Sequence, residues 1–197
     1  MKKIKLWKNR NELSDKVAIV DDEDYEKIVE ACVRKNGMPG KWYAHNNNST
    51  ADYAMSGGRR KSIHRVVMDA PKGMDVDHAN GNPLDNRKSN LRICTRSQNS
   101  QNKKLRRDSA TGFKGVWKKR GIKYTSKKTG ETKYYELKKP YEAYIGDPAT
   151  ANPNKRQIKL GIYATPEEAA KVYDKKAKEL YGEFAYLNFP DLKKIPK

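Results

Sequence analysis

The sequence predicts an α+β protein with two small domains, and three observations lead to this prediction. Residues 17–35 read as a short strand followed by a helix, because their apolar residues change from continuous to helical spacing. Residues 113–163 contain three strand-like runs, and an amphipathic helix is expected from Thr165 to near Gly182. Residues 105–111 are basic and show no apolar periodicity, which is typical of a linker. With 197 residues, of which 36% are hydrophobic and 34% charged, two limited cores fit better than one large core.

The region before the linker is expected to combine a small antiparallel sheet with short helices. Residues 41–68 alternate weakly between apolar and polar side chains, so strands are predicted there, including residues 63–68. Residues 75–102 predict a strand, a long polar loop, a second strand at residues 91–95 and a helix from about Ser97. In the second domain, the helix is expected to cover one face of a three-stranded sheet, and the polar insertion at residues 121–136 is expected to form a basic hairpin.

The charge of the chain points to a polyanionic partner. Lys and Arg number 43 against 24 Asp and Glu, giving a formal net charge of +19, which is typical of proteins that bind a phosphate backbone. No apolar run is long enough to span a membrane or to act as a signal peptide. Cys32 and Cys94 form no metal-binding spacing, so we expect reduced thiols and a cytoplasmic, DNA-associated protein.

The segment MDVDHANGNPLDNRKSNLRICTRSQNSQN carries most of the chemical information in the chain. It places a carboxylate (Asp77), an imidazole (His78) and three amides (Asn90, Asn99 and Asn102) within 29 residues, 74–102. Carboxylate and amide oxygens suit a hard divalent cation such as Mg²⁺, and a neutral imidazole is a natural general base near pH 7. An Asp-His dipeptide alone is most often an ordinary loop feature, so the inference depends on the whole ordered set.

This ordered set resembles the HNH, or ββα-metal, endonuclease family, in the branch found in phage and intron-encoded homing endonucleases. The shared pattern is D-H, N-G-N, D-N-R, S-N-L-R and T-x-x-x-N-x-x-N. The resemblance implies that His78 is the general base, that Asp77 and Asn99 hold Mg²⁺ or Mn²⁺, and that Asn90 ties the loop and orients the His78 ring. Asn99 stands where many relatives have a final His, which makes the ligand on the helix less secure than Asp77.

Four further residues are candidates for contacts with substrate or phosphate. Asn102 is a weaker candidate, which either contacts phosphate or packs with the helix. Arg87 and Arg92 could hold the scissile phosphate, although a solvated surface Arg is the more common reading. His64 matches the H-R-[LV]-[VI] element of the same family, and either a substrate contact or a structural role fits it.

The second domain resembles the Apetala/ethylene-response-factor DNA-binding domain. The shared residues are Gly115–Val116, Leu160–Gly161, T-x-E-E-A-A-x-x-Y-D from Thr165, and A-x-L-N-F-P from Ala185. The resemblance implies a sheet that lies in the major groove of double-stranded DNA with the helix packed behind it. Strand alternation then places Val116 and Ile158 toward the helix. It places five residues toward DNA: Trp117, Lys119, Tyr144, Gln157 and Lys159.

The sequence therefore predicts a metal-dependent DNA endonuclease of the homing type. We expect an HNH domain at residues 1–104, a linker at 105–111, a DNA-binding domain at 112–190 and a basic tail at 191–197. No long heptad pattern is present, so a monomer or weak dimer is expected. The first alternative is a non-catalytic DNA-binding regulator with a degenerate HNH scaffold. The second is a basic RNA-binding protein, which fits the charge but not the HNH pattern.

Overall fold

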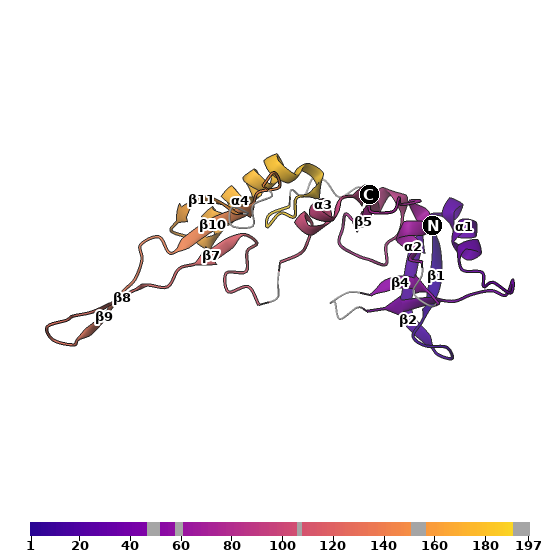
Figure 1. The fold of residues 1–197 in the computed structure, drawn as a ribbon, viewed down its shortest axis with the longest axis horizontal. Coiled ribbons are helices and arrows are strands. Elements are labelled where there is room, and N and C mark those ends of the chain that lie inside the picture. Colours follow the sequence, from indigo (N-terminus) through magenta and orange to yellow (C-terminus); the bar gives the residue numbers. More distant parts are fainter. Residues whose placement is uncertain (47–51, 58–60, 106–107, 151–156, 191–197) are drawn as a thin grey trace. The chain divides into compact units, whose positions relative to one another are not determined.

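A computed structural model describes residues 1–46, 52–57, 61–105, 108–150 and 157–190 of the chain (Figure 1). The chain divides into two compact units, residues 1–102 (the N-terminal unit) and residues 103–197 (the C-terminal unit). The predicted basic tail at 191–197 and part of the predicted linker lie outside the described residues. In the described part of the chain, no helix is long and apolar enough to cross a membrane.

The N-terminal unit is built on a four-stranded sheet with the order β2-β1-β3-β4. Its strands are β1 (Lys2–Trp7), β2 (Leu13–Val20), β3 (Trp42–His45) and β4 (Tyr53–Ser56). Strands β1 and β2 pair antiparallel, as do β3 and β4, whereas β1 and β3 are parallel. After the short 3-10 turn Asp22–Asp24, helix α1 (Tyr25–Ala31) lies in the region where a helix was predicted.

Residues 63–68 were predicted as a strand, and this prediction is wrong: Ile63–Val67 is helix α2. Ile63 and Val67 are both buried, and they are four residues apart, which is the spacing of one helical face rather than of a strand. Strand β1 was not predicted, although the sequence KKIKLW alternates with a period of two and Leu6 is fully buried.

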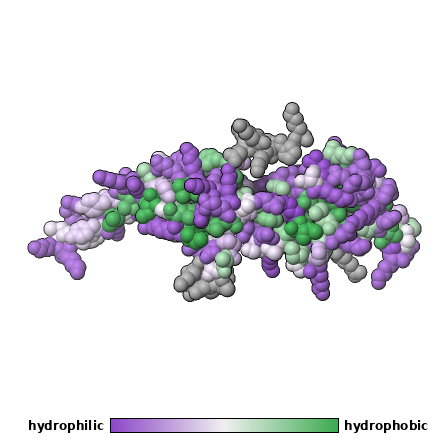
Figure 2. All heavy atoms as spheres, turned by 90° about the horizontal axis from the view of Figure 1, so that it is seen from above, coloured by the Kyte–Doolittle hydropathy of each residue, from purple (hydrophilic) through white to green (hydrophobic). Residues whose placement is uncertain are grey.

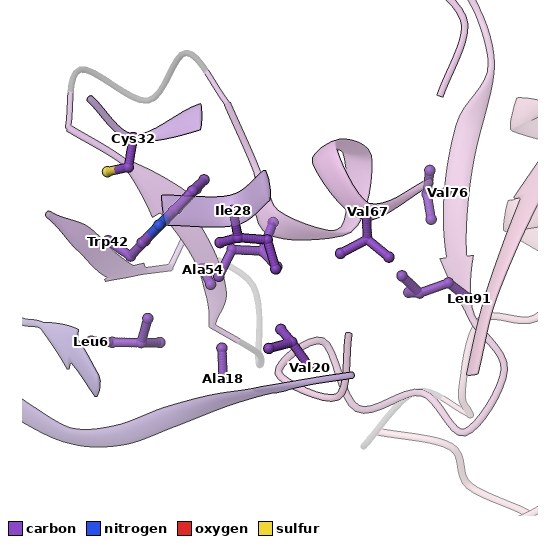
Figure 3. Close-up of a cluster of buried hydrophobic side chains, with 11 residues drawn as sticks. Leu6, Ala18, Val20, Ile28, Cys32, Trp42, Ala54, Val67, Val76 and Leu91 are labelled. Atoms are coloured by element: carbon purple, nitrogen blue, oxygen red, sulfur yellow. The ribbon is translucent and has the colours of Figure 1, made fainter. Parts of the chain in front are cut away.

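The core of the N-terminal unit extends from the sheet to a separate hairpin (Figure 3). Leu6, Ala18 and Val20 from β1 and β2 belong to the same buried cluster as Val76 and Leu91. The last two residues lie on β5 (Asp75–His78) and β6 (Leu91–Cys94), which pair antiparallel and are followed by helix α3 (Arg96–Gln101). Burial of one face of this hairpin fixes Asp77 and His78 on the body of the unit.

The β5–β6–α3 unit agrees with the predicted strand, loop, strand and helix. Helix α3 begins at a capping box, in which the Thr95 side chain accepts from the Gln98 N–H and the Gln98 side chain accepts from the Thr95 N–H. This cap fixes where the helix starts and therefore which of its residues face β5.

The C-terminal unit contains the predicted three-stranded antiparallel sheet packed on one helix. The sheet order is β11-β10-β7, formed by β7 (Val116–Lys118), β10 (Tyr141–Gly146) and β11 (Gln157–Tyr163). Helix α4 (Pro166–Tyr181) begins at a second capping box, made by Thr165 and Glu168, and a 3-10 turn, Gly182–Phe184, follows it. The predicted basic hairpin is also present, as β8 (Ile122–Thr125) paired with β9 (Thr132–Tyr135).

Small side chains allow α4 to lie close to the sheet. Ala169, Ala170 and Ala177 are fully buried. Ala169 and Ala170 share a cluster with Ala143 and Val116, whereas Ile158 packs against a second cluster that contains Ala177. Val116 and Ile158 therefore face the helix, as strand alternation predicted.

The A-x-L-N-F-P motif closes the C-terminal unit. The Asn188 Oδ1 accepts from the Lys114 N–H at 2.6 Å, and its Nδ2 donates to the Lys114 carbonyl at 3.1 Å. Asp174, buried on α4, accepts from the N–H groups of Asn188 and Phe189. The motif therefore joins the segment before β7 to the helix.

Substitution of Gly115 by alanine should destabilise the C-terminal unit more than substitution of Gly112. Both glycines have positive φ, +74° and +72°, so both substitutions carry a backbone cost of about 1–2 kcal/mol. A Cβ at Gly115 would lie 2.1 Å from the Tyr173 ring, whereas nothing lies within 4 Å at Gly112. The steric overlap should add about 1–3 kcal/mol.

Hydrogen exchange of the β10 amides in the full-length protein measures this difference. Gly112→Ala is the matched control for backbone strain. Equal loss of protection in the two variants would contradict the packing of Tyr173 against Gly115.

Candidate active site

Asp77 and His78 end strand β5, and both are buried, with 6% of each residue exposed. Successive side chains of a strand point to opposite faces. Asp75 and Asp77 therefore share the face toward α3, whereas His78 points to the other side, toward the long loop and α2. The two predicted chemical groups are adjacent in sequence but have different surroundings.

The face with Asp77 is made by β5, β6 and α3. The Arg92 guanidinium of β6, opposite Asp77 in the strand register, forms an ion pair with the Asp77 carboxylate. Asn102 donates from Nδ2 to both carboxylate oxygens of Asp77 at 3.0 Å and to the His78 carbonyl at 3.2 Å. One turn earlier, the Asn99 Nδ2 donates to the Asp75 carboxylate at 3.1 Å. Two amides of one helical face thus meet two carboxylates of one strand face.

His78 is held by Asn86, a residue that the sequence reasoning did not select. The Nε2 of His78 lies 3.4 Å from the Oδ1 of Asn86, which is 1% exposed. With an amide oxygen as partner, Nε2 carries the proton and Nδ1 keeps a lone pair. Burial lowers the pKa of His78, against smaller raising effects of Asn86 and of the Asp77 and Asp85 carboxylates. The ring is therefore neutral at pH 7, the form that can accept a proton.

The loop between β5 and β6 is tied by Asn90. Its Oδ1 accepts from the Asn80 N–H at 3.0 Å and its Nδ2 donates to the Asp85 carbonyl at 2.8 Å, so it closes the loop. The His78 ring forms its hydrogen bond with the Oδ1 of Asn86 rather than with Asn90. The N–H of Asn86 also donates to the carbonyl of Ile19 on β2, which fixes this loop to the sheet.

Arg87 lies in the same loop, where it supports the fold. Its Nε and Nη2 donate to the two carboxylate oxygens of Asp85 at 2.7 and 2.6 Å. Asp85 is 3% exposed, and this two-point contact with the guanidinium lowers its pKa. Arg87 therefore neutralises a buried carboxylate, and this structural role requires no contact with phosphate.

His64 lies beside His78. The two rings are edge to face with their centroids 5.2 Å apart, and the Tyr53 ring is 5.8 Å from His64 and 6.2 Å from His78. The Nε2 of His64 is 3.1 Å from the Ser62 hydroxyl, and burial lowers the pKa of His64 to about 3. His64 is therefore a neutral ring that helps to enclose His78. Tyr53, which no motif in the sequence marked, completes this enclosure.

The donor set around Asp77 fits a hard divalent cation. Asp77 supplies carboxylate oxygens, and Asn99 and Asn102 supply amides from α3. In the described part of the chain, no three His, Cys, Asp or Glu side chains gather as a cluster that could hold a metal. Mg²⁺ commonly binds through one or two protein oxygens and keeps several waters, so a carboxylate with an amide suffices for it.

A cleft of about 1150 Å³ also lies in the N-terminal unit. Its described lining carries no carboxylate but six basic side chains, those of Lys8, Arg10, Arg34, Lys35, Lys41 and Lys61. Neither Asp77 nor His78 lines this cleft, so the predicted chemistry lies outside it.

On the outer face of the C-terminal sheet, four of the five residues predicted to contact DNA lie around Glu142, which the sequence analysis did not select. Glu142 of β10, 5% exposed, accepts from Lys159 at 2.5 Å and from the Tyr144 hydroxyl at 3.0 Å. Lys119 lies 2.9 Å from the same carboxylate. Trp117 is opposite Glu142 in the register and is 62% exposed. Gln157, the fifth residue, is exposed on β11.

Glu142 holds two lysines of this face, and the Lys159 contact is the main reason that the pKa of Glu142 is lowered to about 2. Glu142→Gln should therefore strengthen binding to random-sequence DNA several-fold. It should also steepen the decrease of affinity with salt by about one charge, because the loss of one carboxylate charge leaves the two lysines with one more net positive charge for phosphates. Gel shifts at several salt concentrations measure this. Glu167→Gln, a substitution at an exposed residue of helix α4, is the matched control, and an equal effect there would assign the gain to net charge alone.

Comparison with known proteins identifies the family of the N-terminal unit. Residues 63–101 match the family model of the HNH endonucleases, HNH_3. This range contains α2, β5, β6 and α3 and includes Asp77, His78 and Asn99, whereas Asn102 lies one residue beyond it. The chain is also 30% identical, over 154 residues, to an uncharacterised HNH endonuclease of Acanthamoeba polyphaga mimivirus, a match that covers 75% of this chain and 66% of that protein. The chain belongs to the HNH endonuclease family.

Two other relatives match shorter stretches of this HNH family member. Protein 3.8 of Escherichia phage T7 is 35% identical over 69 residues, 34% of this chain and 57% of that protein. Dehydration-responsive element-binding protein 2E of rice is 55% identical over 42 residues, 21% of this chain and 13% of that protein. This second match is to a DNA-binding protein of the Apetala/ethylene-response-factor class. The chain thus spans less than two thirds of each of these relatives. No solved structure matches it.

Proposed function

We propose that this HNH family member is a metal-dependent DNA endonuclease. The observation that carries the proposal is the pairing of Asp77 and His78 at the end of β5, with Asp77 facing the amides of α3 and His78 neutral and held by Asn86. Net charge of +19 supports a nucleic-acid substrate.

His78 acts as the general base in this proposal. Its Nε2–H is directed to Asn86, so Nδ1 takes a proton from the attacking water while the oxygen of that water bonds to phosphorus and the bond to the leaving sugar oxygen breaks. His64 and Tyr53 border the ring and limit the water around it. Asn90 acts indirectly, by holding the loop that carries Asn86.

Asp77 and Asn99 are proposed to hold Mg²⁺ or Mn²⁺. Asn99 uses its Nδ2 on Asp75, which leaves its Oδ1 as the oxygen to offer a cation, and Asn102 orients the Asp77 carboxylate. When bound, such an ion supplies positive charge that stabilises the phosphorane and the leaving oxygen. Arg92, already paired with Asp77, is placed to contact the same phosphate.

The C-terminal unit is proposed to position the nuclease on double-stranded DNA. Trp117, Lys119, Tyr144, Gln157 and Lys159 would meet the major groove, since a sheet of this width can enter it. The proposed domains are residues 1–104 for cutting and 112–190 for binding. The proposed protein is a phage-type homing endonuclease with one active site per chain.

Incubation of the wild-type chain with supercoiled plasmid tests this function. We expect open circles when Mg²⁺ or Mn²⁺ is present and none in chelator, because one active site nicks one strand. DNA binding by gel shift with no nicking under any metal would instead indicate a non-catalytic DNA-binding regulator. Nicking that persists in chelator would contradict the metal site.

A further inference from the structure

The β8–β9 ribbon is an addition to the C-terminal fold. It connects β7 to β10, which already pair directly with each other, so the three-stranded sheet is complete without it (Figure 1). All eight strand residues of the ribbon are exposed, at 122–125 and 132–135 (Figure 2). A two-stranded hairpin alone is at best marginally stable in water. The ribbon thus costs conformational entropy that nothing in the described part of the sheet repays.

One face of the ribbon presents large side chains to solvent. Residues opposite each other in an antiparallel register share a face, and the pairs are Ile122 with Tyr135 and Tyr124 with Lys133. Ile122, Tyr124 and Tyr135 are 58%, 57% and 53% exposed. A row of large exposed side chains next to a lysine is typical of a binding surface.

The other face differs in character. It holds Tyr134, 74% exposed, with Lys123 over its ring, and the Thr125 and Thr132 hydroxyls are 3.0 Å apart. Here the polar groups satisfy one another. Both faces of the ribbon therefore carry exposed tyrosines, but the neighbours of these tyrosines differ between the two faces.

The ribbon is also strongly basic. Residues 119–139 contain eight Lys or Arg and two Glu, and Lys127 and Lys128 lie at the turn. One of the two acids, Glu131, is 3.7 Å from Lys133. The surface thus combines tyrosines with a large excess of positive charge, which suits DNA and opposes contact with a second copy of this basic chain.

We propose that the β8–β9 ribbon is a second DNA-binding arm. It lies in a groove of the duplex beside the segment held by the three-stranded sheet, with Ile122, Tyr124 and Tyr135 against the bases and sugars and the turn lysines on the phosphates. A two-stranded ribbon fits the major groove, and phosphate contacts fix its register. This proposal rests on the proposed function, since it assumes that the chain binds double-stranded DNA.

Salt-dependent binding of full-length variants to a long duplex tests the arm. The double variant Tyr124→Ser, Tyr135→Ser should bind about ten-fold more weakly with an unchanged salt slope, because an anchor but no charge is lost. Tyr134→Ser, the matched control on the opposite face, should stay within two-fold of wild type. Lys127→Gln with Lys128→Gln should reduce the slope of log affinity against log salt by about two.

Replacement of residues 121–136 by a short Gly-Asn-Gly turn guards against variants that merely unfold the ribbon. This variant should keep the sheet and show a shorter footprint on DNA. It should also combine the weaker binding of the tyrosine variant with the reduced salt slope of the lysine variant. Wild-type affinity and footprint in the shortened protein would overturn the arm, as would an equal effect of Tyr134→Ser. If the wild-type protein fails to bind DNA, the proposed function fails together with the arm. If instead the shortened protein nicks plasmid and binds DNA with wild-type affinity, only the arm is overturned.

Discussion

Substitution of His78 by alanine should lower the rate of DNA nicking by about 10²–10⁴-fold, the usual effect of losing a general base. DNA affinity should stay within two-fold of wild type, because His78 is 6% exposed and contributes no surface charge. Nicking time courses are compared at protein concentrations where gel shifts show the plasmid fully bound. His78→Gln should be equally inactive, since it keeps a polar group near Asn86 but cannot take the proton.

His45→Ala is the matched control for this experiment. His45 belongs to the same unit, where it lies opposite Tyr53 in the β3–β4 register, and among the described residues no hydrogen bond or ring contact joins it to Asp77 or His78. This variant should nick at close to the wild-type rate. If His78→Ala retained more than about a tenth of the wild-type rate, another group would have to be the base.

Substitution of Asp77 by asparagine should abolish nicking at millimolar Mg²⁺. Asparagine keeps the size of the side chain and a partner for Arg92 but removes the negative charge that attracts the cation. Asn99→Ala should raise the Mg²⁺ concentration for half-maximal nicking about ten-fold or more.

Asn102→Ala separates orientation from ligation. Because Asn102 donates to both oxygens of Asp77, its loss should lower the nicking rate while the half-maximal Mg²⁺ concentration changes less than in Asn99→Ala. If Asn102→Ala raised the half-maximal Mg²⁺ concentration more than Asn99→Ala does, Asn102 would be the ligand. An Asp77→Asn protein that nicks with an unchanged metal requirement would contradict both assignments.

The elements that the sequence predicted are those with strong local signals. Helix α4 has Thr165, Pro166 and Glu168 at its start, and the capping box observed there follows from these residues. The β5–β6–α3 unit was predicted because its turns and its polar pattern are both specific. Strand alternation also placed Val116 in the core and Trp117 on the outer face.

The differences arise where tertiary contacts decide. Ile63–Val67 is too short for periodicity to separate a helix from a strand, and burial of Ile63 and Val67 on one face settles it. Asn86 was not selected because its role depends on a loop that is fixed to Ile19, far away in the sequence. Glu142 and Tyr53 were missed for the same reason, since their partners lie in other parts of the chain.

The measurement that tests the central claim most directly is the yield of open circles from supercoiled plasmid. Wild type and His78→Ala are incubated in parallel, each with Mg²⁺ and with chelator. The account predicts open circles only for wild type with Mg²⁺. Open circles from His78→Ala at the wild-type rate, or from wild type in chelator, would contradict it.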